Sequence, residues 1–123
     1  MNPEIFRQVY KYLLVEDFLI YKLTGVPVSE YSVVSSTLLF NIRKEKWWDE
    51  MLEFLGIGID QLPELMSSNE AVGYVTGEAS KETGLSVKTL VSTSAFYHAA
   101  GAIGTSNIVP SMLTEMTGMA LLF

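Results

Sequence analysis

The chain has 123 residues, the usual size of one domain, and its 49% hydrophobic content is sufficient for a core. Fourteen acids against eight bases give a formal net charge of −6, and the bases form no stripe, so nucleic acid is not an expected partner. Since cysteine is absent, a disulfide framework, a thiol nucleophile and cysteine-based zinc sites are excluded, and a reducing, cytoplasmic location is expected.

Helical patterns dominate the start of the chain. A first helix is predicted to start at Pro3, with apolar positions at helical spacing as far as Leu14. A second is predicted over 15–23, with Gly25 as its C-terminal stop. Charged residues interrupt the first twenty positions, so no signal peptide is indicated. The uncharged stretch 89–114 is too polar for a membrane span, so no membrane partner is expected.

The middle of the chain mixes short elements. Residues 29–42 are ambiguous: the first half fits a short helix started by Ser29, and the second half fits a buried strand or an extended segment. The stretch "KEKWWDEMLEFLGI" predicts an amphipathic helix closed by Gly56. A short helical turn ("DQLPEL"), a strand ("AVGYVT") and a short helix ending at Gly84 ("EASKETGL") follow.

The last part reads as strand, sharp turn and helix. A strand is predicted over 87–93 and a helix over 97–104, and a further strand over 115–123. A strand-to-helix turn directs a side chain and backbone N–H groups at a ligand beyond the strand's carboxyl end. The Ala and Gly residues of "HAAGAIG" would allow another backbone to pack closely against this helix. We therefore expect an α/β fold, helix-rich with a few strands.

The sequence as a whole resembles the FGGY-family carbohydrate kinases, particularly the xylulokinase-like members. The resemblance covers nearly the whole chain and is specific because eight segments occur in the family's order and spacing. These segments are "YKLTG", "STLLFNI", "WWDEMLEFLGI", "QLPEL", "AVGYVT", "ETGLS", "AAGAIGTSNI" and "TEMTGMALL".

The resemblance implies a partial ribonuclease-H-like domain of the actin and hexokinase superfamily. Residues 1–114 correspond to the latter part of the N-terminal, sugar-binding domain, and 115–123 to the first strand of the following domain. The implied activity is ATP-dependent phosphorylation of a sugar hydroxyl, on a xylulose-like ketopentose or polyol. The full-length family uses ATP and Mg²⁺, whereas no bound cofactor is expected on this chain.

The alignment with the family also assigns site residues. The family's general-base aspartate falls at Tyr97 and its sugar-contacting neighbour at His98. An aspartate with a pKa of about 3.9 accepts a proton at neutral pH, whereas a tyrosine with a pKa of about 10 keeps its own. Thr117 and Gly118 align with the turn that faces the nucleotide phosphates. Tyr97 is therefore not expected to act as a competent base, and no kinase activity is expected from this chain alone.

Three serines also depart from the family pattern. Ser94, Ser106 and Ser111 stand where glycine is usual. A turn that needs a positive φ would be strained at a serine.

Each functional interpretation has a structural alternative. His98 is either a sugar contact or a structural histidine, and Tyr97 either a modified catalytic position or a half-buried aromatic. Trp47 and Trp48 suggest a sugar-stacking platform, but their spacing favours a core position for at least one of them.

The acids provide no convincing catalytic pair. Asp49, Glu50 and Glu53 fit a solvated helix face, and Glu16 with Asp17 would favour the start of the second helix through its dipole. With one histidine and no cysteine, no protein-built metal site is expected. The alternative to a kinase piece is a non-catalytic binding or scaffold module that folds alone or as a homo-oligomer.

Overall fold

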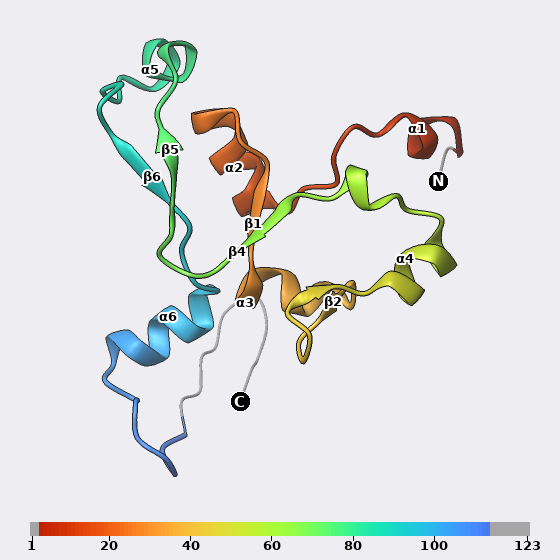
Figure 1. Cartoon of the computed structure of the whole chain (residues 1–123). Helices are drawn as coiled ribbons and strands as arrows, with labels where there is room; N and C mark the ends of the chain where they lie inside the picture. The colour runs from red at the N-terminus through yellow and green to blue at the C-terminus, as the bar shows by residue number, and fades with distance from the viewer. Residues whose placement is uncertain (1–2, 114–123) are drawn as a thin grey trace.

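The computed structural model describes residues 3–113, in which helices and short strands alternate (Figure 1). The strands form three two-stranded sheets: β1 pairs in parallel with β4, while β2 with β3 and β5 with β6 are antiparallel. The helices are α1 (Pro3–Gln8), α2 (Val15–Thr24), α3 (Tyr31–Val34), α4 (Asp49–Leu55), α5 (Gly77–Thr83) and α6 (Tyr97–Gly104), with 3-10 turns η1 (Ser35–Thr37) and η2 (Ile59–Gln61). The strands are β1 (Val28–Glu30), β2 (Phe40–Asn41), β3 (Lys46–Trp47), β4 (Glu64–Met66), β5 (Ala71–Tyr74) and β6 (Leu90–Ser92).

Helix α2 forms where the sequence predicts it. Asp17 in its first turn accepts the Leu14 N–H at 3.0 Å, which satisfies a backbone donor that the helix leaves free. Gly25 ends the helix with φ 78°, and its N–H donates to the Tyr21 carbonyl at 2.7 Å. The left-handed conformation explains why glycine occupies this position.

The first helix is shorter than predicted, because residues 9–14 form long-range hydrogen bonds instead. The Tyr12 N–H donates to the Gln61 carbonyl at 2.8 Å, and the Gln61 side-chain amide donates to the Val9 carbonyl at 3.0 Å. Lys11 Nζ lies 2.7 Å from the carbonyl oxygens of both Asp60 and Leu62. The bonds to Gln61 of η2 thus occupy backbone groups of Tyr12 and Val9 that a continuing helix would have used.

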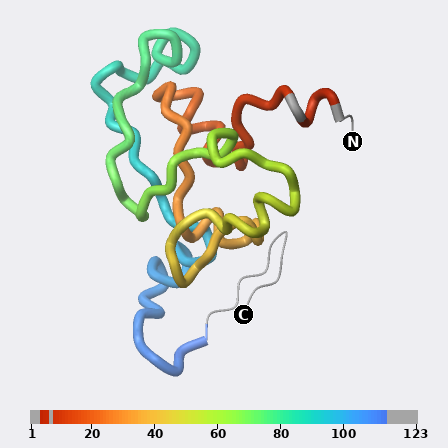
Figure 2. Tube along the Cα trace, turned by 45° about the vertical axis from the view of Figure 1, so that its right-hand side comes forward, coloured from red at the N-terminus to blue at the C-terminus, as the bar shows by residue number. Residues whose placement is uncertain are grey.

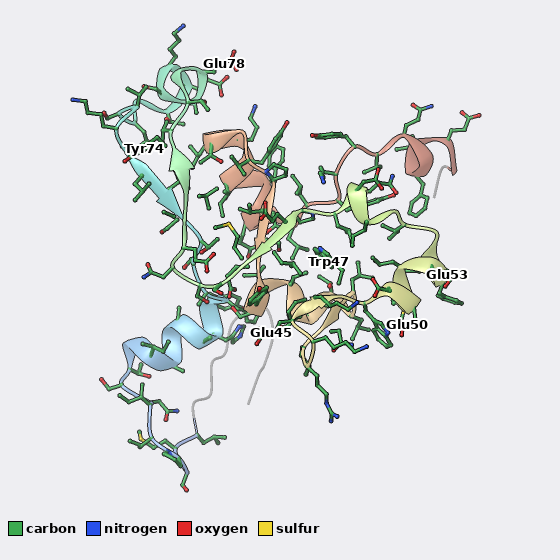
Figure 3. All side chains as sticks on the ribbon, viewed as in Figure 1. Glu45, Trp47, Glu50, Glu53, Tyr74 and Glu78 are labelled. Carbon is green, nitrogen blue, oxygen red and sulfur yellow. The ribbon has the colours of Figure 1, made fainter. Side chains whose placement is uncertain are left out.

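The hydrophobic core contains Trp47, and its position corrects the predicted tryptophan helix. Helix α4 begins only at Asp49, because Trp47 belongs to β3 and pairs with Phe40 of β2. Trp47 is 7% exposed and its Nε1–H donates to the Pro63 carbonyl at 3.1 Å (Figure 3). The expectation that at least one tryptophan is in the core is confirmed. The buried cluster consists of Val34, Phe40, Trp47, Leu52 and Leu62.

The structure defines the secondary structure of residues 29–42, for which the sequence allowed either a helix or a strand, and of the segment after α4. Ser29 lies within β1, and Glu30 is the residue that caps α3. The extended segment predicted for the second half of this region is the two-residue strand β2. The "DQLPEL" segment starts in the 3-10 turn η2 and, after Leu62 and Pro63, ends in β4, so only its first residues form the predicted helical turn.

The β5–β6 hairpin carries α5 at its end, away from α4 in both views (Figures 1 and 2). The Thr76 N–H donates to the Leu23 carbonyl at 2.9 Å, which joins this hairpin to α2. The Thr76 hydroxyl caps α5, and Gly84 ends it with φ 78°. Strand β6 is shorter than the predicted 87–93, since residues 87–88 form a turn. Within the described residues, no helix is long and apolar enough to cross a bilayer.

Candidate functional site

The predicted strand-to-helix junction is present in the structure. Strand β6 ends at Ser92, residues 93–96 form a short connection, and α6 runs over the predicted 97–104. The predicted strand 115–123 and the candidate phosphate contacts Thr117 and Gly118 lie outside the described residues.

Thr93 attaches the start of the connection to the turn between β4 and β5. Its hydroxyl donates to the Ser67 carbonyl at 2.7 Å and accepts the Glu70 N–H at 2.9 Å. Its backbone N–H donates to the Glu70 carbonyl, also at 2.9 Å. Thr93 is 2% exposed, so water competes little for these bonds.

Ser32 attaches the end of the connection to α3. The Phe96 N–H donates to Ser32 Oγ at 2.8 Å, although the two residues are 64 positions apart. Ser32 Oγ in turn donates its proton to Glu30 Oε2. Together these bonds fix the backbone immediately before Tyr97.

Glu30 is a buried carboxylate surrounded by donors. Its Oε2 accepts the N–H groups of Ser32 at 2.9 Å and Val33 at 3.1 Å, and its Oε1 accepts the Ser68 hydroxyl at 2.6 Å. Burial alone would raise the pKa of Glu30, but these hydrogen bonds outweigh it, so the pKa is lowered from its ordinary value. Glu30 is therefore held in its charged form while 5% exposed.

Tyr97 and His98 occupy the first turn of α6 and form an aromatic group with Phe96. The His98 ring lies 4.9 Å from the Phe96 ring and 3.9 Å from the Tyr97 ring, centroid to centroid. Tyr97 is 49% exposed. Both ring nitrogens of His98 are buried and have no hydrogen-bond partner among the residues that the structure describes. Such unpaired polar atoms are uncommon in folded proteins, so each requires an explanation such as a bound water, a bound ion or a catalytic role.

A pocket of about 300 Å³ adjoins the junction. Tyr97 and Ser94 line one side, and α2 contributes Asp17 and Ile20 to the other. Burial raises the pKa of Asp17, while the Leu14 N–H and the nearby Ser29 hydroxyl oppose the rise. Glu16 and Glu30 also line this pocket. The pocket thus joins apolar walls to acidic side chains, of which Asp17 has a reduced tendency to ionise and Glu30 is held charged.

The chain matches a known protein family in sequence and solved members of that family in structure. The model for the N-terminal domain of the FGGY family of carbohydrate kinases matches residues 1–104. This chain belongs to the FGGY family. The predicted class, part of an actin/hexokinase-like α/β domain, is confirmed by solved FGGY kinase structures. A ligand-bound xylulose kinase from Lactobacillus acidophilus superposes with TM-score 0.78 and 25% identity, covering 85% of this chain and 21% of that chain.

Individual FGGY kinases are also similar in sequence. The xylulose kinase of Bacillus subtilis is 35% identical over 103 residues, which is 84% of this chain and 21% of that protein. A glycerol kinase from Thermococcus onnurineus is 50% identical over 64 residues, covering 52% of this chain and 13% of that protein. This chain therefore spans about a fifth of the length of the xylulose kinases that it matches.

Two of the three serines at glycine positions of the FGGY pattern have a positive φ. Ser106 and Ser111 adopt φ values of 60° and 73°, so the predicted left-handed turns are present at serine. Ser94 is not among the described residues with positive φ, so no such strain arises there. The predicted close packing is not seen at Gly104, where an added Cβ would meet no described atom within 4 Å.

The structure also adds residues that sequence reasoning missed. Glu30, Ser32 and Thr93 hold the junction, yet nothing in their local sequence marks them, because each acts on a segment distant along the chain. Asp49, Glu50 and Glu53 are exposed, as predicted for a solvated face. Figure 3 labels Glu50 and Glu53 on α4. Within residues 3–113, no three His, Asp or Glu side chains lie close enough together to hold a metal ion.

Proposed function

We propose that this chain forms one wall of the sugar-binding cleft of an ATP-dependent FGGY carbohydrate kinase, with a xylulose-like ketopentose or polyol as the substrate class. The supporting observation is the first turn of α6, which presents Tyr97 and His98 at the end of β6 within the family match. The similarity to xylulose kinases over most of the chain supports the substrate class. Residues 1–114 would be the latter part of the first domain, and 115–123 the start of the next.

Within this cleft, His98 is the group assigned to sugar binding. Its two ring nitrogens lack partners among the described residues, and a neutral imidazole can donate from one nitrogen and accept at the other. Neighbouring hydroxyls of a sugar offer both kinds of partner. Phe96 and Tyr97 flank the ring and restrict its rotation.

Tyr97 stands at the position of the family's general base, where its phenol takes the place of the carboxylate that would accept the sugar's proton. Phosphoryl transfer further needs ATP and Mg²⁺, which the family uses, and no described residue cluster is assigned to the metal. We propose that the chain binds the sugar without phosphorylating it on its own. A cytoplasmic location agrees with the absence of cysteine.

The test combines turnover and binding. A coupled ADP-release assay with D-xylulose, glycerol and related sugars is expected to give no turnover above the blank. Thermal melting is expected to shift upward with D-xylulose, because a ligand that prefers the folded state raises stability. Turnover would refute inactivity, and the lack of a shift with any sugar would refute the sugar site.

A second candidate is a scaffold module that self-associates, and the exposed surface area of the chain supports it. A monomer of 13.7 kDa is expected to expose about 6,600 Å² of surface, whereas this chain exposes 8824 Å². The excess includes large apolar side chains such as Phe54, Val15 and Leu113. A dimer mass by light scattering without any sugar-induced thermal shift would favour this candidate over the kinase wall.

A further inference from the structure

We propose that Glu30 and Ser32 are positioning residues for the sugar-facing turn. They hold the Phe96 N–H and thereby set the position of Tyr97 and His98. This inference rests on the proposed function for its ligand, but its geometry is independent of the ligand. It is carried by one chain of hydrogen bonds through residues 30, 32 and 96.

The direction of each hydrogen bond follows from the number of protons available. The Ser32 hydroxyl has one proton, and it donates this proton in a hydrogen bond to the Glu30 carboxylate, which can only accept. The Ser32 oxygen therefore presents its lone pairs to the Phe96 N–H, 2.8 Å away. A hydroxyl without Glu30 could rotate and present its proton to that N–H instead.

Glu30 itself has little freedom to move. It is buried, and the N–H groups of Ser32 and Val33 fix Oε2 at the start of α3 while the Ser68 hydroxyl fixes Oε1. The carboxylate is thus attached both to α3 and to the turn after β4. Ser32 extends this attachment to Phe96, the residue directly before α6.

The consequence reaches the aromatic group through the backbone. Phe96 precedes α6 directly, and no side chain caps that helix. Its N–H bond to Ser32 is the contact that fixes the backbone at this point, while Thr93 fixes the other end of the connection. Movement of Phe96 would carry with it the Tyr97 and His98 rings that pack against it.

Ser68 provides a matched control. Ser32→Ala and Ser68→Ala each remove one serine donor to Glu30, but only the first removes the acceptor of the Phe96 N–H. Ser32→Thr keeps the hydroxyl and should restore the contact. The three variants therefore separate a general loosening around Glu30 from a specific loss at Phe96.

The experiment measures native-state amide exchange of Phe96, the NMR shifts of the Tyr97 and His98 rings, and D-xylulose affinity by calorimetry. Ser32→Ala is expected to speed Phe96 exchange about tenfold, as expected for one lost hydrogen bond, and to move both ring signals. It should weaken D-xylulose binding about tenfold, while Ser68→Ala and Ser32→Thr stay within about twofold of the wild type.

The outcomes are distinguishable. Equal effects of Ser32→Ala and Ser68→Ala, or unchanged ring signals in Ser32→Ala, would overturn the inference. Unchanged affinity alongside faster exchange would overturn it as well. If the wild type binds no sugar, the proposed function fails, and the exchange and ring signals still decide the positioning role. Should Ser32→Ala not fold, the same readouts on Glu30→Gln decide, with faster Phe96 exchange expected.

Discussion

The buried carboxylate of Glu30 makes a measurable prediction about stability and pH. In Glu30→Gln the side-chain volume is kept, but the charge that strengthens four hydrogen bonds is removed. Hydrogen bonds to a charged group contribute about 1 kcal/mol more than neutral ones. In the wild type, the penalty of burying the charge offsets part of this stabilisation from the four hydrogen bonds. We therefore expect Glu30→Gln to be about 2 kcal/mol less stable than the wild type at pH 7.

The pH dependence has a defined sign. The pKa of Glu30 is lowered in the folded state from an ordinary value of 4.5. Its contribution is therefore fully present above that value and is lost as the pH falls through the folded pKa. The difference in unfolding free energy between wild type and Glu30→Gln should be constant from neutral pH down to about 5.5 and shrink below about 4.5.

Urea unfolding followed by tryptophan fluorescence measures this difference, since Trp47 is buried and will report on loss of the core. Ser68→Ala, which removes one of the four bonds and leaves the charge of Glu30 in place, should show a smaller loss of about 1.5 kcal/mol. A difference between wild type and Glu30→Gln that is absent at pH 7, or that grows on acidification, would refute the reasoning.

Two further predictions concern the interior. Trp47→Phe should lower the unfolding free energy by about 2 kcal/mol, because the Pro63 carbonyl loses its donor and a cavity opens. As the control, Trp48→Phe at a 37% exposed position should change the unfolding free energy by less than about 0.5 kcal/mol. Equal losses for the two variants in urea titrations would argue against a core role specific to Trp47. Asp17→Asn should raise stability at pH 7, because burial raises the pKa of Asp17. The stabilising contribution of the protonated Asp17 is complete below pH 3.8 and is lost as the pH rises through the folded pKa. The gain, measured by the same titration, should vanish below pH 3.8, and a gain that persists there would contradict the assignment.

Local signals in the sequence located several elements well. Gly25 and Gly84 end α2 and α5 in left-handed conformations, as glycine at the end of a helical segment predicts. The junction and helix 97–104 were also predictable, because the Ala and Gly run follows a strand pattern. In each case the residues that decide the structure are neighbours along the chain.

Where the sequence-based expectation was wrong, distant residues decide the structure. Residues 9–14 have helical spacing, yet their backbone groups bond to η2 about fifty positions away. Trp47 has helical spacing too, but it pairs with Phe40 across two strands. The Ser32 contact with Phe96 is of the same kind, since no window of sequence contains both residues. Long-range pairing of this kind overrides local periodicity.

The connection 93–96 is attached at both ends, by Thr93 to the β4–β5 turn and by Phe96 to Ser32. Its number of residues is therefore fixed by the distance between two attachment points rather than by its own composition. Chemical variety at this junction can arise only by exchanging side chains at constant length, for example at Ser94 and Ala95, which line the pocket. An inserted or deleted residue would break one attachment, so a designer wishing to alter ligand preference here should substitute and never lengthen.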